Sequence, residues 1–74
     1  MNFSQALEAV KHGDAKAARA GWNGKGMWIA AQYPDDHSMM TQPYVYMRTA
    51  DGQLIPWLCS QADMFASDWE IVNG

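Results

Sequence analysis

Apolar residues recur with a helical period at the start of the chain. Four apolar side chains fall at i, i+3, i+4 and i+7, which places them on one face of a short helix: Phe3, Ala6, Leu7 and Val10. Asn2 or Ser4 is suited to cap the first free N–H groups, and Gly13 is suited to a left-handed stop. A helix of about two turns is unstable alone, so the pattern predicts that it packs on another element.

Beyond the helix the pattern changes to alternation. Residues 15–22 alternate in side-chain character and predict a strand, although alanine by itself favours helix. Asn23-Gly24-Lys25-Gly26 indicates a turn, because Asn-Gly readily supplies the positive φ angles of a hairpin. Residues 27–32 are predicted to return as the second strand of that hairpin, and residues 33–42 are predicted to form a loop.

A second hairpin is predicted in the next part of the chain. Residues 44–48 are rich in aromatic and β-branched side chains, as is typical of a strand. Asp51-Gly52 is a turn signal, and residues 53–58 are predicted to be the partner strand. Pro56 has no N–H to donate, so we expect it near a sheet edge or at the end of its strand.

The last part of the chain predicts a short helix and a final strand. Ser60-Gln61-Ala62-Asp63 combines an N-cap with an acidic residue in the first turn, and Ala66-Ser67-Asp68 closes the helix. Residues 69–72 are predicted to form a strand, with residues 73–74 as a tail. The sequence therefore predicts an α+β fold in one domain, residues 1–74: a small antiparallel sheet of about five strands, an N-terminal helix and a short helix before the last strand.

The size of the chain limits how it can be stabilised. A chain of 74 residues buries a small core, and a single cysteine, Cys59, excludes an internal disulfide. His12 and His37 lack companion ligands at metal spacing, so no metal site is predicted. Four Trp, three Tyr and two Phe are many for this length. Some of these rings are expected to cover a ligand or a subunit interface, so we expect a homo-oligomer, a dimer or a tetramer.

Charge and chemistry exclude several classes of function. The net charge is −3 and the five basic residues are scattered, so duplex nucleic acid is not an expected partner. No stretch is apolar enough to span a membrane and the N-terminus lacks a signal peptide, so a cytoplasmic location is expected. Cys59 has no histidine near it in sequence, and neither His12 nor His37 has a convincing catalytic companion. We therefore predict no catalytic residues, no cofactor and no enzyme activity.

The segment Trp22-Asn23-Gly24-Lys25-Gly26 is the first candidate binding element. A turn requires Asn-Gly, but it requires neither a tryptophan before it nor a lysine inside it. Trp22 offers a flat face for a base, the glycines allow close approach to the backbone, and Lys25 can contact a phosphate. The alternative is that Trp22 belongs to the core and Lys25 is solvated.

A second candidate element lies between residues 56 and 69. It combines Trp57 with the polar side chains of Ser60, Gln61 and Asp68 near a helix N-terminus. The alternative is that Trp57 fills the core while Ser60 only caps the helix. Trp69 lies in the predicted last strand and is expected in the core. The Met39-Met40 pair in the loop is either an adaptable contact surface or folded back onto the core.

Several motifs together resemble the second type of Thoeris anti-defence proteins, a phage and prophage family. The resembling stretches are Met1-Asn2-Phe3 with Ala6-Leu7 and Gly13, Ala18 to Met27, Tyr46 to Gly52, and Trp57 with Ser60 to Asp63 and Ala66 to Glu70. They extend over nearly the whole chain, and the combination is more specific than any single stretch. The loop at residues 33–42 is shorter here than in many relatives.

The resemblance implies a non-enzymatic sponge. Such proteins bind and sequester cyclic ADP-ribose-type signals, including the glycocyclic type, and some relatives sequester cyclic oligonucleotides. The resemblance also implies homo-oligomers with ligand pockets between subunits in the infected host's cytoplasm. Trp22 matches the tryptophan expected to stack on the base, Asn23 to Gly26 match the adjoining turn, and residues 56–68 match a segment of polar contacts. The alternatives are an anti-CRISPR-type protein–protein inhibitor and a phage accessory protein without a ligand.

Overall fold

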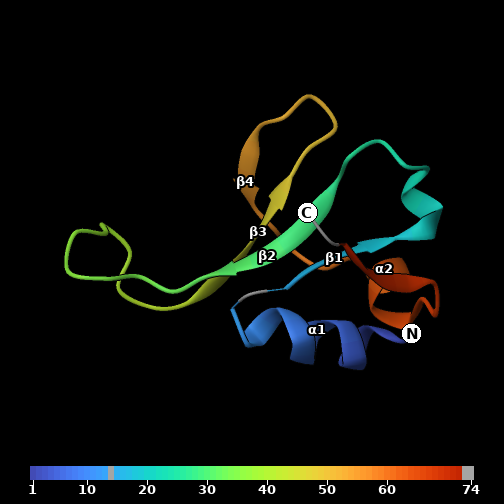
Figure 1. Cartoon of the computed structure of the whole chain (residues 1–74), viewed down its shortest axis with the longest axis horizontal. Coiled ribbons are helices and arrows are strands. Elements are labelled where there is room, and N and C mark those ends of the chain that lie inside the picture. The colour runs from blue at the N-terminus through green and yellow to red at the C-terminus, as the bar shows by residue number, and fades with distance from the viewer. Residues whose placement is uncertain (14, 73–74) are drawn as a thin grey trace.

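A computed structural model of the chain shows one long helix lying across one face of a five-stranded antiparallel sheet (Figure 1). The structure describes residues 1–13 and 15–72. The elements in chain order are α1 (Phe3–Lys11), β1 (Lys16–Arg19), the 3-10 helix η1 (Ala20–Trp22), β2 (Trp28–Gln32), β3 (Tyr44–Arg48), β4 (Leu54–Pro56), α2 (Gln61–Phe65) and β5 (Trp69–Val72). The sheet order is β4-β3-β2-β1-β5, so the last strand pairs with the first. The predicted α+β architecture is confirmed. The predicted tail at residues 73–74 lies outside the described residues.

Helix α1 begins and ends at residues that the sequence singles out. The Asn2 side chain accepts a hydrogen bond from the Gln5 backbone at 2.9 Å, and the Gln5 side chain accepts one from the Asn2 backbone. This reciprocal capping box decides between the two predicted caps in favour of Asn2. Gly13 has φ +89°, the left-handed conformation that stops the helix.

The core lies between α1 and the sheet face that it covers. Its buried side chains come from α1, β1, β2, β3 and β5: Ala6, Val10, Ala17, Ile29, Met47 and Trp69. Trp69 is the largest of them and is only 2% exposed, which confirms its predicted place in the core. Because each strand alternates its side chains between two faces, one pattern of apolar residues is enough to fix which face α1 covers.

The first predicted hairpin is partly wrong. The strand predicted over residues 15–22 ends at Arg19, and Ala20 to Trp22 form η1 instead. The chain turns there because the Ala20 N–H donates to the Asp68 carbonyl at 3.0 Å, and the Asn23 N–H donates to the Ala20 carbonyl at 3.1 Å. Alternation alone does not reveal such a tertiary hydrogen bond. The predicted strand over residues 27–32 is confirmed as β2, which begins one residue later.

The second hairpin forms where it was predicted, with a shorter return strand. The Gly52 N–H donates to the Thr49 carbonyl at 3.0 Å and Gly52 has φ +88°, as in hairpins built on a turn followed by a left-handed residue. Strand β4 covers only Leu54–Pro56 of the predicted residues 53–58. Pro56 is the last residue of this edge strand, where its missing N–H costs no ladder hydrogen bond, as expected.

None of the helices in the described residues covers the other face of the sheet. Trp28 and Tyr46 pack edge-to-face there with ring centroids 5.9 Å apart, and the Lys16 ammonium lies 4.2 Å from the Trp28 ring centroid. By the strand register, Ala18 and Ala30 lie on this same face, and each is only 7% exposed. The larger side chains of Trp28, Tyr46 and Lys16 therefore shield the small alanines of this face from water.

The loop between β2 and β3 extends away from the rest of the sheet (Figure 1). Met39 is 97% exposed and Met40 is 54% exposed on it. These exposures contradict the alternative that the two methionines fold back onto the core. No helix in the part of the chain that the structure describes is long and apolar enough to cross a membrane.

Ile29→Ala is predicted to destabilise the protein strongly. Ile29 is fully buried beneath α1, and deleting three buried carbon groups from such a site costs about 2–5 kcal/mol. Ile29→Val is the matched control and should cost about 0.5–1.5 kcal/mol. Urea unfolding monitored by tryptophan fluorescence measures both; equal midpoints for the two variants would contradict the central place of Ile29 in the core.

Candidate ligand-binding site

The turn after η1 has an unusual backbone. Asn23 and Gly24 both lie in the left-handed region, with φ of 63° and 64°, and Gly26 has φ 75°. Asn23 is the only non-glycine residue with positive φ among those described. The Gly26 carbonyl accepts a hydrogen bond from Arg48 of β3 at 2.9 Å, which anchors the far end of the turn. The Lys25 side chain is exposed. The positive φ angles predicted for Asn-Gly are confirmed.

Trp22 lies at the boundary between the core and the surface. Its ring meets the Trp69 ring edge-on, with centroids 5.2 Å apart and an interplanar angle of 78°. The Trp69 ring in turn packs against Trp57, with ring centroids 6.2 Å apart, and against Phe3, with ring centroids 5.3 Å apart. Trp22 is half-buried, so part of its ring supports the core and part faces solvent. The alternative that Trp22 belongs to the core therefore holds for part of the ring, and stacking of a base on the exposed part stays a prediction.

An ionic cluster, which we call the Arg19 clasp, joins the end of β1 to the segment around α2. It consists of Arg19, Asp63 and Asp68. The Arg19 Nη1 donates to Asp63 Oδ1 at 2.8 Å, and Nε donates to Asp68 Oδ1 at 2.8 Å. The Arg19 side chain is 22% exposed, so water screens these ion pairs only in part. The two carboxylates raise the pKa of Arg19, which stays charged at any ordinary pH.

The same Asp68 carboxylate holds the backbone that leads into Trp22. Its Oδ2 accepts a hydrogen bond from the Gly21 N–H at 2.8 Å. A Cβ at position 21 would lie 3.0 Å from that oxygen and 3.2 Å from Arg19 Nη2, so a larger residue here would push the Asp68 carboxylate and the Arg19 guanidinium away from this backbone. The hydrogen bond from Arg19, assisted by the one from Gly21, holds the pKa of Asp68 below its ordinary value of 3.8.

The structure brings some of the predicted ligand residues together and leaves others apart. Asp68 lies against Gly21, next to Trp22, and Trp57 shares the Trp69 ring with Trp22. The Ser60 hydroxyl accepts from the Asp63 N–H at 3.1 Å and caps α2, as one reading of it predicted. The Gln61 side chain is exposed at the start of α2. Within residues 1–13 and 15–72, no hydrogen bond links Ser60 or Gln61 to the turn.

The nucleophilic and metal-ligating side chains show ordinary surroundings. Burial, followed by the negative charge of Asp63, raises the pKa of the Cys59 thiol, so it is protonated and weakly nucleophilic near neutral pH. His12 lies 3.6 Å from Glu8 on the surface of α1, and the His37 N–H donates to Asp35 in the exposed loop. No group of three metal ligands occurs among the described residues.

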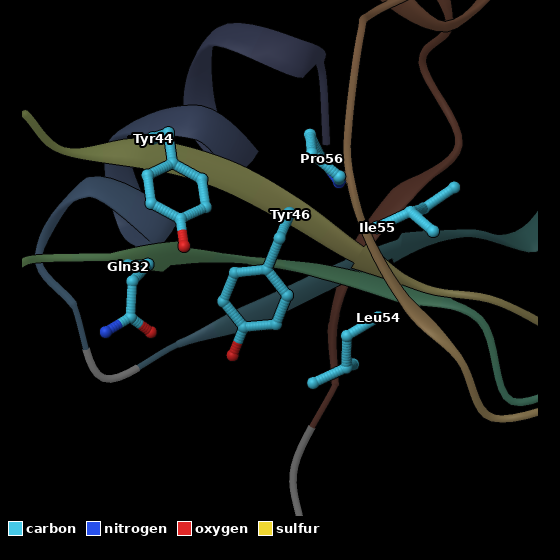
Figure 2. A pocket seen from close by; sticks show the side chains of 6 residues that line it. All are labelled: Gln32, Tyr44, Tyr46, Leu54, Ile55 and Pro56. Carbon is cyan, nitrogen blue, oxygen red and sulfur yellow. The ribbon is translucent and has the colours of Figure 1, made fainter. Parts of the chain in front are cut away.

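Two hollows lie away from the turn. One, about 190 Å³, is on the open face of the sheet (Figure 2) and is lined by Gln32, Tyr44, Tyr46, Leu54, Ile55 and Pro56. It is smaller than the roughly 300–1,000 Å³ of typical small-molecule pockets. The other, about 340 Å³, lies beside α1 and is lined by Leu7, Lys11, Ala31, Tyr33, Pro43, Tyr44 and Val45. None of the predicted ligand residues lines either hollow, so a ligand at the turn would use a different surface.

Arg19 and Asp63 are the structurally central residues that the sequence reading missed. Arg19 was seen only as one scattered cation, and Asp63 only as a carboxylate in the first turn of a helix. The helix assignment is right, but the partner of both carboxylates lies more than 40 residues away. The one available signal was opposite charge: Arg19 lies in the resembling stretch that contains Trp22, and Asp63 and Asp68 lie in the stretch that contains Trp57.

Comparison with known proteins identifies a family. The family model for the Tad2-like domain, described as a Thoeris anti-defense 2-like domain, matches residues 1–72. The chain is also 34% identical to "Thoeris anti-defense 2" of Bacillus phage SP01 over an alignment of 86 residues. That alignment covers 99% of this chain and 96% of the relative. It is longer than this chain, so the relative contains residues that have no counterpart here.

The Arg19 clasp predicts an acid-sensitive contribution to stability. Because the pKa of Asp68 is lower in the folded state, its contribution is present above about pH 4 and is lost as pH falls through the folded value. The melting temperatures of the wild type and Asp68→Asn should therefore converge as the pH falls below about 4. Other carboxylates titrate in both proteins and cancel in the difference. A difference that stays constant down to pH 2 would show that Asp68 has no lowered pKa.

Proposed function

This chain belongs to the Thoeris anti-defense 2-like family, and from this premise we propose that it is a phage anti-defence protein acting as a sponge. It binds a cyclic nucleotide immune signal of the ADP-ribose type, including the glycocyclic type, and releases it chemically unchanged. Cyclic oligonucleotides share the same base and phosphate chemistry and are the second ligand class. By sequestering the signal in the host cytoplasm, the protein prevents the defence response that the signal would start.

One observation carries the proposal. The Trp22 ring packs against the core on one side and lies beside a turn in which Asn23, Gly24 and Gly26 have positive φ. Trp22 is fixed on one side by Trp69, while the rest of its ring faces solvent. Stacking of a base on such a ring contributes about 1–3 kcal/mol. A ring already held in place loses little side-chain entropy on binding, which favours affinity.

The turn beside Trp22 supplies the remaining chemistry. Asn23 offers an exposed amide, and Gly24 has open space where a Cβ would stand, so a ligand can approach its backbone. Lys25 is exposed and provides a positive charge for a pyrophosphate. Together with Gly26, these residues form the phosphate and ribose side of the proposed site.

Residues from the segment around α2 complete the site. Trp57 shares the aromatic cluster with Trp22, while Ser60 and Gln61 stand at the first turn of α2. Exposed apolar side chains nearby support a subunit contact in a dimer or tetramer: Leu58 is 93% exposed and Phe65 is 82% exposed.

A second function is favoured by the loop between β2 and β3. The exposed Met39 and Met40 provide a flexible apolar contact on a segment that projects from the body (Figure 1). This feature suits an inhibitor that binds a protein of the host defence. The two functions differ in their partner, so the experiments below separate them.

The sponge is predicted to return its ligand intact. Purified protein incubated with cyclic ADP-ribose isomers and with cyclic di- and trinucleotides should deplete one class from the free pool, as measured by chromatography after filtration. Heating should denature the protein and restore that class unchanged, because binding forms no covalent bond. A chemically altered product would instead identify an enzyme. Depletion of none of these compounds would favour the protein–protein inhibitor.

Trp22→Ala is predicted to weaken ligand binding by about 5- to 150-fold, the loss expected from one stacking partner. Trp28→Ala is the matched control, since Trp28 lies on the uncovered face of the sheet against Tyr46 and lines no part of the turn. Calorimetry measures affinity, and thermal unfolding shows whether each variant folds. Equal affinity of a folded Trp22→Ala variant and the wild type would remove Trp22 from the site.

A further inference from the structure

We propose that Asp68 is a positioning residue, which acts with Arg19 to fix η1, the 3-10 helix that carries Trp22, and does not itself contact the ligand. The inference rests on the proposed function, because a positioned Trp22 affects binding only where Trp22 takes part in it. It changes the role expected for Asp68 from a direct polar contact to a support of the aromatic surface.

The hydrogen-bonding capacity of Asp68 is largely used inside the protein. Its Oδ1 accepts from Arg19 Nε at 2.8 Å, and its Oδ2 accepts from the Gly21 N–H at 2.8 Å and from Arg19 Nη2 at 3.4 Å. An ionised carboxylate has about four acceptor sites, and three donors already point at this one. A ligand hydroxyl would have to displace a charge-assisted bond to reach it.

The position of Asp68 gives it control over both the backbone and the ring of Trp22. Its carboxylate holds the Gly21 N–H, and its carbonyl accepts from the Ala20 N–H at 3.0 Å. Two successive N–H groups of η1 are thus tied to one residue. The ring of the next residue, Trp69, packs against the Trp22 ring, with ring centroids 5.2 Å apart. One short stretch of chain therefore sets where η1 lies and how the ring of Trp22 is turned.

Asp63 provides an internal comparison. Its Oδ1 accepts from Arg19 Nη1 at 2.8 Å, the same distance as from Arg19 Nε to Asp68 Oδ1. It lies in α2, however, and none of the described hydrogen bonds joins its carboxylate to η1 or to the turn. If positioning of Trp22 is the relevant effect, loss of the Asp63 carboxylate should alter binding much less than loss of the Asp68 carboxylate.

The test compares Asp68→Asn, Arg19→Gln and the double variant, with Asp63→Asn as the matched control. The affinity for the compound that the wild type binds most tightly in a panel of cyclic ADP-ribose isomers is measured by calorimetry. The indole N–H signal of Trp22, assigned by its loss in Trp22→Phe, is followed by NMR without ligand. Asp68→Asn and Arg19→Gln should each weaken binding about tenfold and shift the Trp22 signal, whereas Asp63→Asn should do neither.

The double variant distinguishes positioning from direct contact. Residues that act through one shared arrangement are not additive, so the double variant should also bind about tenfold more weakly than the wild type. A loss of about a hundredfold would mean that Asp68 contacts the ligand independently, and it would overturn the proposal. An unmoved Trp22 signal in a folded Asp68→Asn variant would overturn it equally.

A second perturbation applies if the charge variants do not fold. Gly21→Ala retains all charged residues and has no positive φ to oppose it, but its Cβ must displace the Asp68 oxygen from 3.0 Å. It should shift the Trp22 signal and weaken binding about tenfold; an unchanged signal would overturn the proposal. A wild type that binds no compound in the panel, with the Trp22 signal shifted in Asp68→Asn, would refute the proposed function while supporting the positioning role.

Discussion

The indole of Trp69 is the place where α1, the sheet, η1 and α2 meet. It is 2% exposed, its ring contacts Phe3, Trp22 and Trp57, and its Nε1 donates to the Asp63 carbonyl at 2.9 Å. Its backbone pairs with Met1 on one side and with Arg19 of β1 on the other. A buried tryptophan removes on the order of 150–250 Å² from water, a large share of the apolar burial in so small a domain.

The geometry of the proposed site depends on the position of Trp69 in β5. Because β5 pairs with β1, Asp68 arrives directly beside Arg19 and Gly21, and Trp69 arrives beside Trp22. The Trp22 ring, which is proposed to stack on a base, thus also packs against the core. In the proposed site this arrangement would provide a preformed surface, and it would also link ligand binding to stability, since changes to the surface reach the core.

The fold leaves a large apolar surface uncovered for a chain of this length. One face of the sheet is shielded by its own side chains, among them Trp28, Tyr46 and Lys16, and Leu58 before α2 and Phe65 at the end of α2 stand exposed. A two-layer domain with a single long helix has too few elements to cover both faces of five strands. The proposed subunit contact would bury part of this surface beside the residues that complete the ligand site.

Local patterns in the sequence determined much of the fold and the existence of the candidate turn. The spacing of apolar residues from Phe3 to Val10 requires a helix against a core, Ser60 caps α2, and Asn23 with Gly24 adopts the left-handed angles that Asn-Gly favours. These features depend on neighbours within a few residues, which a sequence displays directly.

The tertiary structure alone decided where β1 ends, that β5 lies beside β1, and what Asp68 binds. Strand β1 stops at Arg19 because Ala20 turns toward the carbonyl of Asp68, and Arg19 is neutralised by carboxylates from the far end of the chain. Arg19 and Asp68 are 49 residues apart. Their contact exists only because β5 lies beside β1, and periodicity says which face a residue takes but not which strand lies next to it.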